Sequence, residues 1–184
     1  MKPNFLLVLF CLTGFSSFAQ GHYNGQYAIG AQYGATKDGN AYNLNVQRLI
    51  GDNYFGARVD LNYYDKTNKL TVVETEIVPH KILSLGIAGT YSLEEILPHP
   101  LYAQIHLGAQ YSNENFNEGK SISSKGLEYT APNENVFGLY TGIEIELSLL
   151  KFLSITGTAQ TQRMFNSDVD KSIYFLGGGL KFNL

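Results

Sequence analysis

Six ionisable residues stand at alternate positions in segments that read as two-faced strands. All six fall on the polar side: Arg58, Asp60, His106, Glu144, Glu146 and Lys181. Such a set could form a buried acid–base site or line a path for ions. It could also form a structural network of charge-assisted hydrogen bonds, because charges in a narrow interior must be paired. We favour the structural network, since a narrow cylinder of strands leaves no room for an open channel.

Histidine and serine offer a second kind of chemistry, that of an enzyme acting on membrane lipids. Such a site needs a serine, a histidine and a carboxylate close together near the outer rim of the fold. His80 lies near the start of a strand, but no serine is paired with a histidine at a spacing that puts both on one face near the outer rim. His22 and His99 fall at the opposite end, and the four histidines lack the i, i+2 or i, i+4 spacing of a zinc site. The sequence therefore predicts a protein that is not an enzyme, with no cofactor and no metal site.

A long polar segment, residues 112–135, could carry recognition, because loops held on a rigid scaffold often do. It contains spaced apolar side chains that could dock a partner protein or pack back on the loop itself. These candidate partner-loop residues are Phe116, Ile122, Leu127 and Tyr129.

These candidates are positioned by eight segments in which apolar and polar residues alternate, the period of a β-strand with two different faces. Residues 54–64 are the clearest, with Val59 and Leu61 on one face and Arg58 and Asp60 on the other. Residues 65–79 show no sustained alternation and are interpreted as a loop with a strand extension. The predicted strands are residues 26–35, 41–50, 54–64, 80–93, 101–111, 136–149, 151–165 and 171–184.

Eight strands of this length fit a small membrane barrel, because strands tilted near 45° cross a bilayer in about 9–11 residues. The predicted fold is all-β: an eight-stranded antiparallel up-and-down transmembrane β-barrel in contact with outer-membrane lipid. Long connections follow the third and fifth strands, an asymmetry that places both termini in the periplasm. A net charge of −3 provides no basic surface for nucleic acid.

A soluble barrel of the lipocalin kind would show the same alternation with its apolar face turned inward. Two observations favour the membrane arrangement. Aromatic residues of the apolar face gather near strand ends, as in interfacial belts, and the polar face is rich in small or amide-bearing residues that fit a narrow lumen. The predicted belts are Tyr33, Tyr42, Tyr63, Tyr111, Phe137, Phe165 and Tyr174 at one rim, and Tyr27, Phe55, Tyr91 and Phe182 at the other.

The first residues are typical of a secretory signal peptide. A lysine precedes an apolar stretch, and Ser17 and Ala19 are small residues at the −3 and −1 positions of a cleavage site. We therefore expect a signal peptide over residues 1–19 and one outer-membrane barrel domain over residues 20–184. Cys11 lies within this leader, so we expect the mature chain to have no thiol.

The last strand ends in a pattern of one glycine followed by apolar residues at alternate positions. Gly179, Leu180, Phe182 and Leu184 carry it, although an aromatic residue usually stands where this chain has Leu184. The pattern resembles the insertion signal read by the outer-membrane assembly machinery. A last strand that pairs with the first removes the final unpaired edge of a barrel.

Three groups of residues between positions 135 and 184 are shared with a known family. They are Phe137, Tyr140 and Gly142; Arg163, Ser167, Val169 and Lys171; and Gly179, Leu180, Lys181 and Phe182. On these residues the chain resembles the TraO family of conjugative-transposon transfer proteins of Bacteroidetes. The resemblance implies a non-enzymatic outer-membrane component of a DNA-transfer apparatus that contacts other transfer proteins. The alternatives are a general porin-like, OmpX-like envelope or adhesion barrel and, third, a lipid-modifying outer-membrane enzyme.

Overall fold

A computed structural model describes residues 25–50, 54–71, 75–93, 96–120, 122, 126 and 135–184. The predicted signal peptide lies outside the described residues, as do Leu127 and Tyr129 of the candidate partner loop. No helix within the described ranges is long and apolar enough to cross a membrane.

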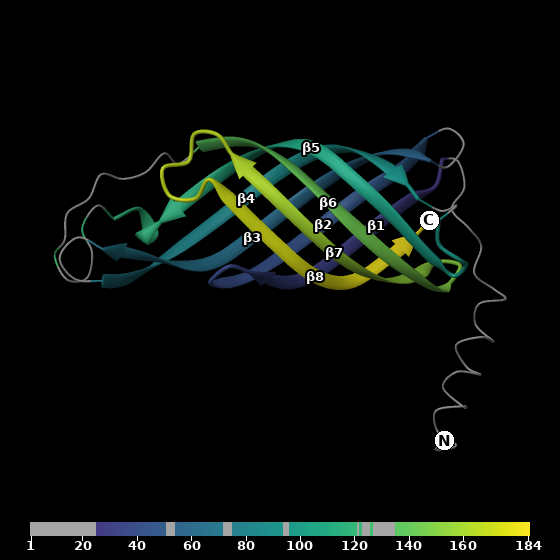
Figure 1. The fold of residues 1–184 in the computed structure, drawn as a ribbon, viewed down its shortest axis with the longest axis horizontal. Coiled ribbons are helices and arrows are strands. Elements are labelled where there is room, and N and C mark those ends of the chain that lie inside the picture. Colours follow the sequence, from purple (N-terminus) through teal and green to yellow (C-terminus); the bar gives the residue numbers. More distant parts are fainter. Residues whose placement is uncertain are drawn as a thin grey trace, which may run out of the picture.

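Eight antiparallel strands form a closed barrel in which each strand pairs with its neighbour in sequence (Figure 1). β8 pairs with β1 from Asn183 opposite Ala28 to Leu176 opposite Ala35, which closes the cylinder. The fold class and all eight predicted strands are thus confirmed. The strands are β1 (Tyr27–Thr36), β2 (Gly39–Ile50), β3 (Phe55–Thr71), β4 (Thr75–Ser92), β5 (Leu101–Phe116), β6 (Asn135–Leu150), β7 (Leu153–Met164) and β8 (Ser172–Asn183).

The two ends of the barrel differ. At the terminal end, where β1 begins and β8 ends, Leu184 donates a backbone hydrogen bond to Tyr27. We call the opposite end, which carries the β1–β2, β3–β4, β5–β6 and β7–β8 connections, the loop end; it lies at the left of Figure 1.

The barrel is inverted relative to a soluble protein, with apolar side chains outside and polar side chains inside. Along β3, Val59 and Leu61 are 46% and 40% exposed, whereas Arg58 and Asp60 between them are 0% exposed. A continuous apolar outer wall of this size is stable only against lipid. This finding overturns the soluble lipocalin-like alternative.

Aromatic side chains form a ring near each end of this apolar wall. Towards the loop end, the ring of Tyr42 lies 5.2 Å from that of Tyr33 and 6.2 Å from that of Tyr63. Towards the terminal end, the rings of Phe55 and Tyr91 lie 5.1 Å apart. Because aromatic residues settle at bilayer interfaces, these two rings mark the limits of the membrane-spanning segments.

The strand extension predicted within residues 65–79 is confirmed, whereas the loop predicted over most of this segment is wrong, because β3 runs to Thr71 and β4 begins at Thr75. β3 and β4 continue to pair beyond Tyr63, as far as Thr71 opposite Thr75, and together extend the barrel at the loop end. Beyond the aromatic ring the outer face of a strand meets water instead of lipid, so the apolar alternation that identifies lipid-crossing strands is lost.

The inner face is also less uniformly polar than predicted. A cluster of seven buried apolar side chains lies inside the loop-end half of the barrel. On β3, Tyr64 of this cluster lies between Asp60 and Lys66, both of which are also buried. We call these residues the apolar plug: Ala41, Tyr64, Ile82, Val136, Met164, Ile173 and Phe175.

The β1–β2 connection is a two-residue turn, Lys37 and Asp38. The residue with positive φ is Asp38, at 64°. Gly39 serves a different purpose, because a Cβ atom there would lie 2.2 Å from the carbonyl oxygen of Asp65.

Candidate functional sites inside the barrel

Five of the six predicted lumen residues form one ion-paired group, which we call the central network: Arg58, Asp60, Glu144, Glu146 and Lys181. The Arg58 guanidinium lies 2.8 Å from both Asp60 and Glu144. The Lys181 ammonium contacts Glu144 and lies 3.0 Å from Glu146. These contacts join strands β3, β6 and β8 across the lumen.

Neutral side chains complete the shell around the network carboxylates. Gln104 and Gln32 donate to the two oxygens of Glu144 at 2.7 and 3.0 Å. The Tyr140 hydroxyl donates to Asp60 at 2.8 Å. Because each carboxylate has both a counter-ion and neutral donors around it, the geometry is that of a packed lumen.

The sixth predicted residue, His106, lies inside the barrel but apart from the ion pairs. Its Nε2 atom lies 3.2 Å from the side-chain oxygen of Gln160, and its ring centre lies 5.9 Å from that of Tyr140. The structure therefore brings His106 next to the network without joining it to a carboxylate.

A second polar group lies at the loop end and was not predicted from the sequence. We call it the mouth cluster: Lys66, Asn68, His80, Glu114, Ser167 and Asp170. Asp170 accepts from Lys66 and, at 3.1 Å, from Asn68, and it lies 3.3 Å from Nδ1 of His80. The contacts hold the β7–β8 connection, residues 165–171, against β3 and β4.

Ser167 fixes the other half of this cluster. Its hydroxyl lies 3.0 and 2.9 Å from the two carboxylate oxygens of Glu114, to which it donates. The same oxygen accepts the backbone N–H of Asp170 at 3.0 Å. The β7–β8 connection is therefore held to β5 as well as to β3 and β4.

The two carboxylates of the mouth cluster differ in their ionisation. Both lie beyond the aromatic ring, since Glu114 follows Tyr111 by three residues and Asp170 lies in a connection. Burial raises the pKa of Glu114 to about 7, against the opposing hydrogen bond from Ser167. Burial also acts to raise the pKa of Asp170, but hydrogen bonds from His80, Lys66 and Asn68 outweigh it and keep that pKa well below its usual range.

The mouth cluster contains serine, histidine and carboxylates, but they are not arranged as a hydrolase site. A nucleophilic serine must hydrogen-bond to the histidine that removes its proton. Here Ser167 is bonded to Glu114, while His80 faces Asp170 and Asn68. Across the described part of the chain, no group of three or more His, Cys, Asp or Glu residues could hold a metal ion.

Of the candidate partner-loop residues, the structure describes Phe116 and Ile122. Phe116 is the last residue of β5 and is buried, with its ring 5.5 Å from that of His80. Its side chain faces inward, so it is not available to a partner. Ile122 is half exposed.

One signal in the sequence could have revealed the mouth cluster. On β3 the buried polar positions follow a strict period of two, Arg58, Asp60, Asn62, then Lys66 after Tyr64. The period of the inward-pointing side chains continues past Tyr64, while the outward-pointing side chains become polar as well. Asp170 lies in a connection, where no period applies.

No protein-family profile matches the sequence, and no curated protein matches it either. Solved structures do. The neisserial surface protein A matches with a TM-score of 0.65 and 12% identity, over 88% of this chain and 98% of that one. A major outer membrane protein of Thermus thermophilus matches with a TM-score of 0.67 and 12% identity, over 86% and 99%.

The attachment invasion locus protein of Yersinia pestis, Ail, matches with a TM-score of 0.58 and 13% identity, over 88% of this chain and all of that one. Identities this low indicate a common fold and nothing more specific. Both the closed topology and these matches lead to the same assignment. The chain has the fold of a small, eight-stranded outer-membrane β-barrel.

Proposed function

We propose that this protein is a closed, non-enzymatic outer-membrane barrel that presents its loop end to the cell exterior and acts by contact with a partner protein. The observation that carries the proposal is the β3–β4 hairpin. About 9–11 residues of a tilted strand cross a membrane, whereas β3 has 17 residues and β4 has 18.

The hairpin offers a contact surface of a defined kind. Among the described residues, β2 pairs with β3 only as far as Lys66, and β5 pairs with β4 only as far as His80. Beyond these points β3 and β4 pair with each other. Backbone groups at such edges can accept an added strand from a partner, and Ile77, which is 66% exposed, adds an apolar anchor.

The interior supports a role in contact over a role in transport. The central network and the apolar plug occupy successive levels of the lumen, and their side chains are almost completely buried. This favours a contact barrel over the porin-like form of the envelope hypothesis.

The identity of the partner is the more specific part of the proposal. The TraO-like residues point to proteins of a conjugative transfer apparatus. The shared fold of Ail, an attachment and invasion protein, points to adhesion instead. Neither choice alters the hairpin as the proposed contact element.

The test is deletion of the gene, followed by complementation with the full chain or with a shortened hairpin. In the shortened variant, residues 69–77 are replaced by Asn-Gly, a two-residue turn that joins the directly opposed Asn68 and Val78. We expect the variant to insert, to show normal heat-modifiable migration, and to fail to complement. Normal complementation by the shortened chain would contradict the proposal.

Two readouts separate the partners. Loss of conjugation frequency with normal adherence selects the transfer apparatus, and the reverse selects adhesion. A photoreactive residue at position 77 should crosslink to the partner in cells, whereas one at Leu107, on the lipid-facing wall, should not.

A further inference from the structure

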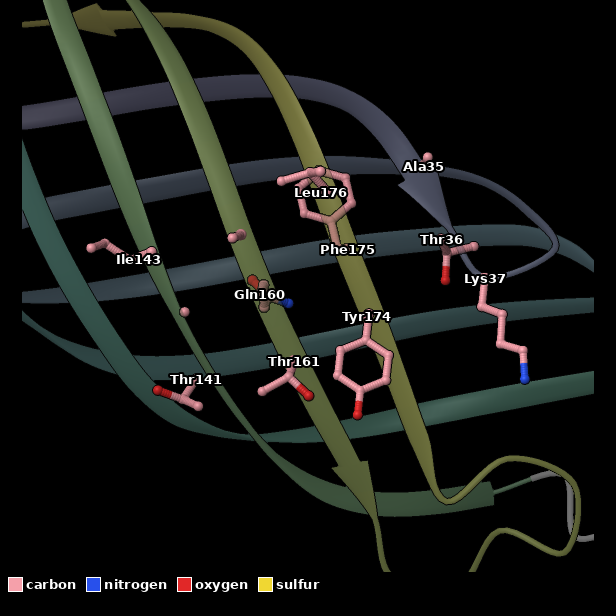
Figure 2. Close-up of a pocket in the computed structure, with 12 residues that line it drawn as sticks. Ala35, Thr36, Lys37, Thr141, Ile143, Gln160, Thr161, Tyr174, Phe175 and Leu176 are labelled. Atoms are coloured by element: carbon pink, nitrogen blue, oxygen red, sulfur yellow. The ribbon is translucent and has the colours of Figure 1, made fainter.

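A shallow groove of about 690 Å³ lies on the lipid-facing wall, where β6, β7, β8 and the end of β1 meet (Figure 2). Its walls follow two neighbouring rows across the sheet. One row is Ile143, Ala159, Leu176 and Ala35; the other is Thr141, Thr161 and Tyr174. Small residues on β7 form its floor, and larger side chains from β6 and β8 rise on either side of them.

The groove runs obliquely through the membrane-spanning wall. Its rows lie across strands that are themselves tilted near 45°, so the rows are inclined to the membrane as well. One end is at Ile143, in the middle of β6, and the other is at Lys37, in the β1–β2 turn of the loop end. An extended hydrocarbon chain laid in it would pass from the interface towards the centre of the bilayer.

Two cations lie at or near the loop end of the groove. Lys37 lines the groove, and Arg163 is exposed two residues beyond Thr161 on the outer face of β7. Neither forms an ion pair with any other residue that the structure describes. Asp38, next to Lys37 in the turn, offsets part of this charge but leaves Arg163 on the lipid-facing wall.

A guanidinium between Thr161 and Phe165 lies just inside the aromatic ring. A cationic side chain in this position extends towards the membrane interface and is stabilised by an anion there. The hydroxyl groups of Tyr174 and Thr161, labelled in Figure 2, lie on the same wall and could donate to that anion.

We propose that this groove is a binding site for a single membrane lipid with an anionic phosphate head group, whose acyl chain lies in the groove and whose phosphate lies between Lys37 and Arg163. The site depends on insertion of the barrel and is independent of the partner contact proposed for the hairpin. If the protein inserts but shows no lipid preference, this inference is wrong, whereas the proposed function is unaffected.

The test uses the full chain in nanodiscs of phosphatidylcholine and phosphatidylglycerol, followed by native mass spectrometry of the lipids that it retains. We expect one retained phosphatidylglycerol, preferred about 10- to 30-fold over phosphatidylcholine, since each cation near a membrane surface contributes attraction for an anionic lipid. The variant with Lys37→Ala and Arg163→Ala should lose this preference. Lys151→Ala, in the turn at the terminal end, is the matched control and should keep it.

A separate variant tests the binding of the acyl chain in the groove. Ala159→Leu should fill the floor of the groove and abolish retention, whereas Ala109→Leu, on the outer wall of β5, should not. Thr161→Leu provides a second filled groove if Ala159→Leu fails to fold. The inference is wrong if no phosphatidylglycerol preference exists, if the preference survives loss of both cations, or if a folded groove-filling variant retains lipid normally.

Discussion

At the scale of single residues, the central network illustrates how a charged side chain is made acceptable inside a membrane protein. Arg58 is fully buried but faces two carboxylates at 2.8 Å. Removing one partner of such a group is far more costly than its net contribution to stability, because the remaining charges stay buried without compensation.

This cost gives a first prediction. Arg58→Met should destabilise the folded barrel by about 3–5 kcal/mol, since it leaves Asp60 and Glu144 against Lys181 alone. Urea unfolding in lipid vesicles measures the change. The matched control is Arg48→Met, because the Arg48 guanidinium is exposed over the ring of Tyr27, 5.1 Å from its centre, and contributes about 0.5–1 kcal/mol. Equal effects of the two substitutions would show that the network is not stabilised by its ion pairs.

Glu114 gives a second prediction at this scale. Its pKa in the folded protein, about 7, is higher than its ordinary value of 4.5. The folded mouth therefore binds the extra proton, and its stability should fall as pH rises from about 4.5 to about 7, by at most about tenfold in the opening equilibrium per pH unit. Lys66, Asp168 and Asp170 are the charged groups that act on Glu114, and Asp170 itself titrates below this window.

The measurement is amide hydrogen exchange at Val169 and Asp170, whose N–H groups donate to Ser167. Protection factors, corrected for intrinsic rates, should decrease across the window in the natural chain and remain constant in Glu114→Gln. A pH-independent natural chain would show that Glu114 ionises normally.

At the scale of elements, closure of the barrel depends on how closely β8 approaches β1. Three consecutive glycines, Gly177 to Gly179, lie in this seam. A Cβ atom at Gly179 would lie 1.9 Å from the carbonyl oxygen of Ala31. A backbone contact of this kind cannot be relieved by a change of rotamer.

Gly179→Ala should therefore weaken the β1–β8 seam, at a cost of about 1–3 kcal/mol or more. The expected result is a smaller heat-modifiable fraction on gels after refolding into detergent. Gly157→Ala on the adjacent β7 is the control, because a Cβ there has nothing within 4 Å. Similar folded fractions for the two variants would contradict this account of the seam.

The strands that could be predicted from the sequence are those whose two faces meet different solvents. All eight membrane-crossing segments show this contrast, so their number and order followed from alternation. The loop-end parts of β3 and β4 do not show it, because both of their faces carry polar residues. Asp65 points outward and Lys66 is buried inside, yet both are charged. The mouth cluster was missed for the same reason, and because Asp170 reaches it from a connection. The central network was easier to predict, since its charges lie on the polar face of strands whose other face is clearly apolar.

At the scale of the whole molecule, the lumen is closed at two levels by different chemistry. The central network closes it with paired charges, and the apolar plug closes it with Tyr64, Phe175 and their neighbours. An ion passing along the axis would have to displace one layer and then shed its water against the other. Each layer alone is a barrier, so the two do not depend on each other.

This arrangement predicts that the protein does not conduct. In planar lipid bilayers the natural chain should give no stepwise current at potentials where a general porin conducts. The double variant Tyr64→Ala and Phe175→Ala, which opens the plug, should remain silent because the central network is intact. Heat-modifiable migration confirms that both proteins are folded. Steps in the natural chain would show that the lumen opens, and steps in the double variant alone would show that the apolar plug is the only barrier.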